Sequence, residues 1–175
     1  KRRMAKPDPT LLVDVVAPKV LAALGLASEA LRAANVRHVV VGGLAVGANG
    51  YPRATKDVDF LVGAEAFHHH PSGLVTLRPE VPFQVHGVAI DLLSPEAGED
   101  FLEATLAAPL GSMMEAPPLV YMKLKSPRRK DSVDVIEMIK AGIDVAPCRA
   151  YLAEHAPSFV AAFDDCLAQA ELEED

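Results

Sequence analysis

The chain has 175 residues, enough for one domain with a sizeable core, and 50% of them are hydrophobic. Aromatic residues make up only 5% and tryptophan is absent, so valine, leucine and alanine must fill that core. The formal net charge of −7 argues against binding of nucleic acid through overall positive charge, although a local basic patch remains compatible with a nucleotide or a tRNA end.

The sequence leads us to expect no segment that directs the chain to a membrane or into a secretory pathway. No apolar stretch is long enough to span a bilayer, and the start, Lys1 to Lys6, lacks the apolar segment of a secretory signal. Cys148 and Cys166 have no metal-like spacing, so we expect buried thiols rather than a disulfide or a zinc site. The expectation is therefore a cytoplasmic protein without membrane contact.

The first predicted elements are helical. After a proline-containing start, residues 11–24 have the periodicity of a helix. Gly25 predicts a break, after which a second helix begins with Ser28 as its N-cap residue and ends at Asn35. We expect this helix pair to pack across a sheet.

Short apolar segments then predict the strands of a mixed sheet. Between the second and third of these segments, residues 64–70 predict a short helix or a loop. Proline and glycine within the later segments allow sheet edges and turns. The predicted strands are residues 39–41, 57–62, 74–77, 81–85 and 88–93.

After the last strand the pattern becomes helical. Ser94 suits an N-cap position with Pro95 as the first helical residue, and the pair Pro117-Pro118 begins the helix that carries Lys123. Each of these prolines lacks an N–H that the first turn of a helix would leave unpaired anyway. We therefore expect two helices in the stretch that follows the sheet.

The remaining helices lie in the C-terminal third. Residues 128–141 predict a helix that ends at Gly142. Its expected inward-facing residues are Val133, Ile136 and either Ile139 or Met138. Pro147 and Pro157 open two further helices.

These elements together predict an α+β fold, with a mixed sheet of four to five strands flanked by helices. We expect a single domain over residues 1–175. Its first part, residues 11–94, holds the helix pair and the sheet, and residues 95–175 form a mostly helical C-terminal part.

A glycine pair forms the turn between the first predicted strand and the helix that follows it. The apolar run Val39–Val41 ends in Gly42-Gly43, and helix-compatible residues follow at once. Glycines at such a turn let backbone N–H groups approach an anion closely, and the following helix adds the positive end of its dipole. The turn therefore predicts a phosphate-binding site.

Three aspartates punctuate the predicted strands. Asp57 and Asp59 are two apart, so a strand would place them on one face, and Asp91 lies inside the apolar run 88–93. Neighbouring carboxylates repel each other unless a cation lies between them, and a buried acid without a partner is costly. The three acids therefore predict a site for a hard divalent cation with room for substrate phosphates.

A Gly-Gly turn, an Asp-x-Asp pair and a third aspartate resemble the DNA polymerase β-like nucleotidyltransferase superfamily. Residues 42–46 and the string Arg53-x-Thr55-x-Asp57-x-Asp59 are most similar to AbiEii-type and related small bacterial nucleotidyltransferases. Residues 119–125 and 129–135 resemble the helical segment that follows the catalytic sheet in that group. The resemblance covers residues 38 to about 140.

The resemblance implies a nucleotidyltransferase fold, a nucleoside triphosphate as donor and Mg²⁺ or Mn²⁺ as cofactor. It implies catalytic and metal-ligating roles for Asp57, Asp59 and Asp91, with Asp91 nearest the nucleophile, where a general base is needed. The residues that would bind the nucleotide are Gly42, Gly43, Arg53, Thr55 and Lys123.

Each of these residues also has a structural interpretation. The aspartates alone are compatible with a solvated edge-strand face, and Arg53 and Thr55 alone with loop or cap residues. Lys123 is as compatible with a surface lysine whose stem packs on the helix as with a phosphate contact. Many superfamily members have Gly-Ser where this chain has Gly42-Gly43, so backbone amides must replace a hydroxyl.

Two further clusters, one basic and one of histidines, lie outside the acid motif and are weaker candidates for a functional site. The basic residues 125–130 suggest either an RNA-facing patch or a solvated helix start, partly neutralised by Asp131 and Asp134. The consecutive histidines 68–70 cannot all face one ion from a regular element, so we expect a solvated loop. His38 and His86 are expected at the edge of the core.

The function expected from the resemblance is transfer of NMP from an NTP to a hydroxyl of an unknown acceptor. The acceptor would be tRNA or a protein, in a toxin–antitoxin or defence setting with a cognate antitoxin as a possible partner. One alternative is a small-molecule acceptor, as in the aminoglycoside and lincosamide nucleotidyltransferases, and another is a catalytically silent binding module of the same fold. An acidic acceptor cleft would favour a cationic small molecule, and a basic one would favour RNA.

Overall fold

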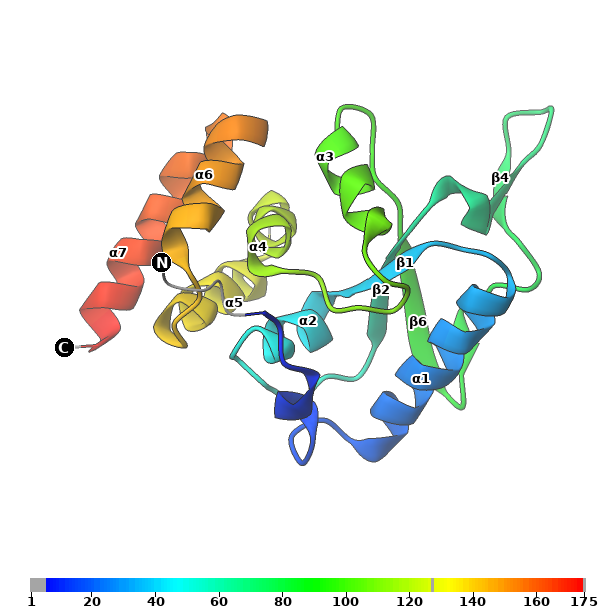
Figure 1. Cartoon of the computed structure of the whole chain (residues 1–175), viewed down its shortest axis with the longest axis horizontal. Coiled ribbons are helices and arrows are strands. Elements are labelled where there is room, and N and C mark those ends of the chain that lie inside the picture. The colour runs from blue at the N-terminus through cyan, green and yellow to red at the C-terminus, as the bar shows by residue number, and fades with distance from the viewer. Residues whose placement is uncertain (1–5, 127, 175) are drawn as a thin grey trace.

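A four-stranded mixed sheet lies at the centre of the protein, with a long helix on one face and the C-terminal helices on the other (Figure 1). The computed structural model describes residues 6–126 and 128–174. The first five residues, part of the segment on which the absence of a secretory signal was predicted, lie outside these ranges. Within the described part, no helix is both long and apolar enough to cross a membrane.

The sheet has the strand order β1-β2-β6-β5 and confirms the predicted α+β class. β2 runs antiparallel to β1 and parallel to β6, and β6 runs antiparallel to β5. The outer edge of β1 is covered, because Val40 exchanges backbone hydrogen bonds with Ser112 and Met114. The bounds are β1 His38–Val41, β2 Val58–Val62, β5 Gln84–Val85 and β6 Val88–Leu93.

One predicted strand belongs to a separate hairpin, which corrects two expectations. β4 (Val75–Leu77) pairs antiparallel with β3 (Phe67–His69) in a two-stranded sheet of its own. The short helix or loop expected over residues 64–70 is therefore a 3₁₀ turn, η2 (Ala64–Ala66), followed by a strand. Gly73 adopts a positive φ of 86° and lets the chain turn back between the two strands.

The first long helix, α1 (Pro18–Ala33), is continuous through Gly25, so the predicted break is wrong. A single glycine costs a helix only about 1 kcal/mol relative to alanine, which the packing of the buried residues on this helix outweighs. Ser28 is therefore a mid-helix residue and caps nothing. Asn35, with a positive φ of 56°, terminates the helix as predicted. Ahead of α1 the chain forms only a 3₁₀ turn, η1 (Pro9–Leu12).

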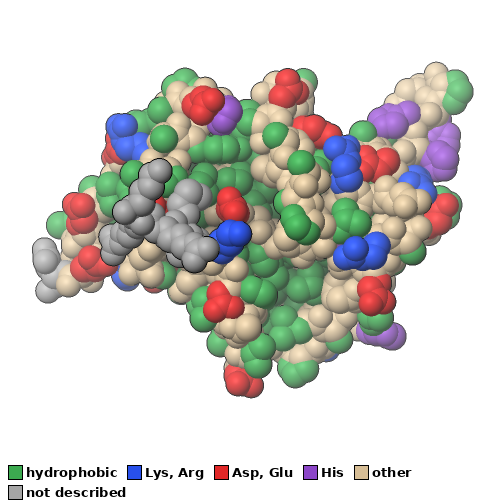
Figure 2. Space-filling view, in the orientation of Figure 1, with side chains coloured by type: hydrophobic (Ala, Val, Ile, Leu, Met, Phe, Trp, Pro, Cys, Tyr) green, Lys and Arg blue, Asp and Glu red, His purple; other side chains and the backbone are tan. Residues whose placement is uncertain are grey.

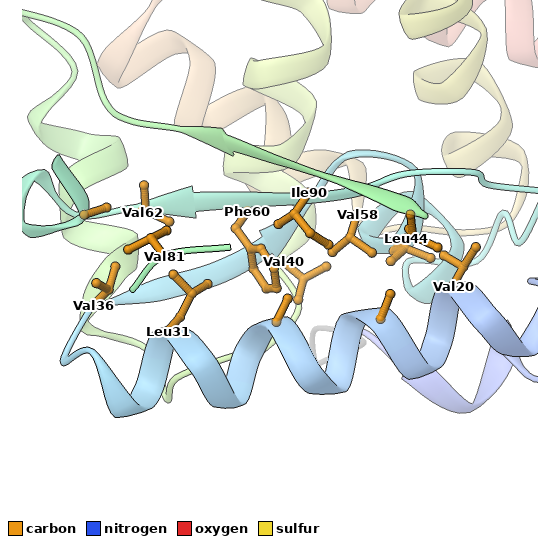
Figure 3. Packing of buried hydrophobic residues seen from close by; sticks show 14 of the residues in the cluster. Val20, Leu31, Val36, Val40, Leu44, Val58, Phe60, Val62, Val81 and Ile90 are labelled. Carbon is orange, nitrogen blue, oxygen red and sulfur yellow. The ribbon is translucent and has the colours of Figure 1, made fainter. Parts of the chain in front are cut away.

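The core between α1 and the sheet is apolar (Figure 3). Val20 and Leu31 of α1 point toward Val40, Phe60 and Ile90 of the strands, and all five are at most 4% exposed. Small residues on the same helix face let the helix approach the sheet closely. This face of the sheet carries no predicted site residue.

The opposite face of the sheet packs against α2 (Gly42–Ala48) and the C-terminal helices. The predicted start at Ser94-Pro95 is wrong, because residues 94–99 form a turn in which the Glu99 carboxylate accepts the Glu96 N–H at 2.8 Å. Pro117-Pro118 lies in the first turn of its helix, as predicted. The helices are α3 (Asp100–Glu103), α4 (Ala116–Lys125), α5 (Arg129–Lys140), α6 (Val145–His155) and α7 (Val160–Glu174), with 3₁₀ turns η3 (Ala104–Ala107) and η4 (Pro157–Phe159).

Helix α5 departs from the prediction at Val133. Val133 was expected to face inward but is 41% exposed. The buried positions are Asp131, Asp134, Val135 and Met138, whose spacing of three and four residues marks one helix face, and of these only Met138 was among the residues expected to face inward. The buried face of α5 thus includes two carboxylates, which must find partners in the interior.

Candidate active site

A pocket of about 700 Å³ opens between the sheet, the loop before β2 and helices α4 and α5. This volume is in the range of small-molecule and cofactor sites. The pocket brings together all the residues that the sequence predicted as catalytic, metal-ligating or nucleotide-binding. They are Gly42, Gly43, Arg53, Thr55, Asp57, Asp59, Asp91 and Lys123.

The carboxylates lie at the sheet side of the pocket. Asp59 of β2 and Asp91 of β6 are direct register partners on parallel strands, and Asp57 immediately precedes β2. Within the described ranges, none of the three forms an ion pair with a basic side chain. Burial, together with the facing charge of Asp91, raises the pKa of Asp59 to about 6.

Gly42 makes room for this acid pair. Its φ of 66° lies in the left-handed region, and a side chain built there would overlap the Asp59 carboxylate. The glycine turn and the Asp-x-Asp motif, which are separate in sequence, therefore form one packed unit. Gly42 lies beside a carboxylate as well as next to the predicted phosphate site.

Gly43 is covered by the loop that precedes β2. A Cβ atom there would lie 3.0 Å from Thr55 Oγ1 and 3.2 Å from Arg53 Nη2. The Thr55 hydroxyl also donates a hydrogen bond of 3.1 Å to the Arg53 carbonyl. The space that a serine side chain would take in a Gly-Ser turn is thus adjacent to a threonine hydroxyl and a guanidinium.

Both predicted cationic residues are held by Asp134 of α5. Arg53 donates two hydrogen bonds to this carboxylate, from Nε at 3.0 Å and from Nη2 at 2.9 Å. Lys123 Nζ donates to Asp134 Oδ2 at 2.9 Å and to Asp131 Oδ1 at 3.0 Å. Lys123 is only 7% exposed, so the surface-lysine interpretation is wrong.

Asp131 completes this buried network. Besides Lys123, it accepts hydrogen bonds from the Ser126 hydroxyl and from Arg128 Nε. Burial alone would raise the pKa of Asp131, but the bonds from Ser126 and Lys123 hold it below the ordinary value. The network fixes α4 and α5 against the loop that carries Arg53.

Asp131 and Asp134 were missed as site residues because sequence reasoning treated them as partial neutralisers of a basic cluster. The available signal was their spacing: Asp131, Asp134, Val135 and Met138 follow the i, i+3, i+4, i+7 pattern of a buried helix face. Acids on such a face need buried cations. Arg53 and Lys123 are those cations.

A second network forms another part of the pocket wall. Glu99, 6% exposed, accepts hydrogen bonds from the Tyr121 hydroxyl at 2.6 Å and from Lys125 Nζ at 3.0 Å. Lys125 also pairs with Glu96 at 2.6 Å. Lys125 of the predicted basic patch is therefore paired with two carboxylates on this side of the pocket.

The acid cluster fits a divalent cation in its chemistry. Asp59 and Asp91 offer hard oxygen ligands, and a bound cation would offset the burial and the neighbouring Asp91 charge that raise the pKa of Asp59. Within the described residues, no three acidic, histidine or cysteine side chains already converge on one point. A bound Mg²⁺ or Mn²⁺ would therefore need Asp57 to turn inward, or water and phosphate oxygens to complete its coordination.

The chain was compared with protein families, with curated proteins and with solved structures. No family model and no curated protein matches the chain. Among solved structures, the chain is similar to an antigenic nucleotidyltransferase-like protein from Paracoccidioides brasiliensis, with 13% identity and a TM-score of 0.43, over 86% of this chain and 94% of that one. A likeness at this level carries no inference about activity, so we infer the function from the residues of the pocket.

Proposed function

We propose that the protein is a nucleotidyltransferase that uses Mg²⁺ or Mn²⁺ to move NMP from an NTP to a hydroxyl of an acceptor. The observation that carries this proposal is the pairing of Asp59 with Asp91, side by side and with no basic partner among residues 6–126 and 128–174, in a pocket that also contains Arg53 and Lys123. A purely structural pocket has no physical need for repelling carboxylates.

The residues opposite the acids are suited to hold the triphosphate. Lys123 has three N–H donors, two of which are used by Asp131 and Asp134, so one remains for a phosphate oxygen. Arg53 likewise retains donors beyond the two that bind Asp134. Asp131 and Asp134 thus act as positioning residues that orient two cations toward the ligand.

The acids would serve the transfer itself. A divalent ion held by Asp57, Asp59 and Asp91 would supply charge neutralisation of the leaving pyrophosphate and a lowered pKa of the attacking hydroxyl. Asp91 would accept the proton of that hydroxyl, while Arg53 and Lys123 keep the donor phosphates in place.

We propose that the acceptor is a hydroxyl of tRNA or of a protein, in a toxin–antitoxin or defence setting. A small cationic acceptor is the second candidate, and one observation favours it. Glu96 and Glu99 line the pocket and pair with Lys125, so the side of the pocket expected to face RNA is less basic than the sequence indicated.

The test is thermal stabilisation by each of the four NTPs, with and without Mg²⁺. A ligand that binds only the native state raises stability by mass action, about 2.7 kcal/mol at a hundredfold excess over Kd. We expect a Mg²⁺-dependent shift with at least one NTP, its loss in Asp57→Asn and Asp59→Asn, and its retention in Asp165→Asn, a control on the exposed face of α7. Equal shifts in wild type and both pocket variants would refute the proposed site.

A further inference from the structure

The hairpin of β3 and β4 carries histidines that the proposed function does not use. His68 of β3 is the register partner of Thr76, and His70 follows the last residue of the strand. The His70 N–H donates to the Leu74 carbonyl at 2.8 Å, so the paired geometry continues to this residue. Histidine side chains are exposed on this projecting hairpin, at the upper right of Figure 2.

Alternation along the strand separates the three histidines into two groups. His68 and His70 are two residues apart and share one face, whereas His69 lies on the other. The rings of His68 and His70 lean together, with centroids 6.1 Å apart and planes tilted by 40°. The three histidines cannot all face one ion, as expected. His68 and His70, however, can face the same ion.

The separation of the rings is close to that of two rings on a shared metal ion. Imidazole nitrogens lie about 2.0–2.1 Å from zinc. Two rings bound to one such ion at a tetrahedral angle therefore have centroids roughly 5 Å apart. The observed 6.1 Å is longer by about 1 Å, so the two rings must move toward each other to share an ion with that geometry.

Thr76 provides an orienting contact for one of the rings. Its hydroxyl lies 2.8 Å from His70 Nε2. When Nε2–H donates to the hydroxyl oxygen, the Nδ1 lone pair of the same ring is available to a metal. Ligating histidines are commonly held in this way by a hydrogen bond from the other ring nitrogen.

We propose that His68 and His70 form a binding site for a borderline transition-metal ion such as Ni²⁺, Cu²⁺ or Zn²⁺. Imidazole ligands prefer these ions, whereas the carboxylates of the pocket prefer Mg²⁺ or Mn²⁺, so the two sites differ in their metal class. No third acidic, histidine or cysteine ligand converges with this pair in the described chain. The site is thus open, with its other positions left to water or an added ligand.

The test is a calorimetric titration of the untagged full chain with Ni²⁺. We expect His68→Ala and His70→Ala each to weaken the tightest binding step at least tenfold, and Thr76→Val to weaken it less. His69→Ala, a matched change in the same hairpin, should alter the affinity less than twofold. Asp59→Asn should retain the wild-type affinity, because the pocket acids are not ligands of this ion.

Two outcomes would overturn the proposal. One is an affinity in His69→Ala that falls as far as in His68→Ala, which would indicate non-specific chelation by a histidine tract. The other is unchanged binding in a His68→Ala/His70→Ala double variant. All four positions are at most partly buried, and circular dichroism spectra identical to wild type would show that the variants fold.

Discussion

The two faces of the central sheet differ in what they bury. The face against α1 is covered by valine, leucine and phenylalanine side chains, and among the described residues the one fully buried ionisable group there is His38. The other face has an apolar cluster of similar extent, but buried charged residues lie beside it. They are Glu99, Lys123, Asp131 and Asp134. One face therefore stabilises the strands, and the other uses those strands to hold a polar pocket.

The largest expected effect is on the α1 face. Phe60→Ala removes a fully buried ring between α1 and the sheet, and should lower the free energy of unfolding by about 3–5 kcal/mol. Chemical denaturation measures this loss. At temperatures where the variant is folded, its affinity for Mg-NTP should match wild type, because Phe60 and the pocket lie on opposite faces. A loss below 1 kcal/mol would contradict the assignment of this face as the stabilising one.

A charge change on the pocket face should act mainly on binding. Asp134→Asn keeps the shape of the side chain but removes the charge that holds Arg53 and Lys123, so the KM for NTP should rise about 10–100-fold, as for other residues that orient ligands. Stability should fall by about 1–3 kcal/mol. Steady-state kinetics measures KM. Glu137→Gln, a change on the same helix, is the control that separates loss of the Asp134 charge from a general disturbance of α5.

If stability falls in Asp134→Asn while KM is unchanged, Asp134 has no positioning role. The network would then only connect α5 to the loop before β2.

The single histidine on the apolar face should make that face sensitive to acid. Burial, and to a smaller degree the charge of Arg32, lowers the pKa of His38 from 6.5. The unfolded chain then binds the proton first, so stability is retained above pH 6.5 and is lost as the pH falls below it, by at most about 1.4 kcal/mol per pH unit. Comparing unfolding at pH 8 and pH 5 in wild type, His38→Gln and the exposed control His69→Gln measures this slope. If stability changes equally with pH in wild type and in His38→Gln, His38 does not cause the acid sensitivity.

The smallest expected effect is at the glycine turn. Gly43→Ser introduces the residue common in the resembling superfamily, but its Cβ would lie 3.0 Å from Thr55 Oγ1. We expect a loss of NTP affinity of no more than about tenfold, or 1.4 kcal/mol. Thr55→Ala in the same chain should restore part of it.

The matched control for the glycine turn is Gly25→Ser, because a Cβ at Gly25 meets nothing within 4 Å. An equal or greater NTP affinity in Gly43→Ser would show that Thr55 and Arg53 do not occupy the space of the absent serine side chain.

The sequence was sufficient to predict that the glycine turn and the three aspartates meet in the pocket, but not that Asp131 and Glu99 also line it. Alternation in strands is a local rule, so Asp57 and Asp59 could be placed together, and the apolar run around Asp91 marked it as a neighbouring strand. The Gly42-Gly43 turn followed from local propensity in the same way. Their roles in binding and transfer stay predictions, and the structure shows only that these side chains are neighbours.

Other features depend on contacts between distant parts of the chain. The pairing of Arg53 with Asp134 spans 81 residues, and no local pattern connects them. The course of α1 through Gly25 depends on the sheet that its buried face covers. β3 and β4 pair with each other and not with the main sheet. Which strands pair, and in which register, depends on the partner strand and not on the composition of either strand.

The packing of Gly42 against Asp59 links two sequence positions that a reader of motifs treats separately. A descendant of this protein that replaced the acid with a smaller residue would no longer need the absence of a side chain at position 42, although the positive φ of 66° would still disfavour most residues there. Joint drift at positions 42 and 59 would therefore mark lineages that had abandoned the pocket. The presence of both residues in this chain is compatible with a pocket still in use.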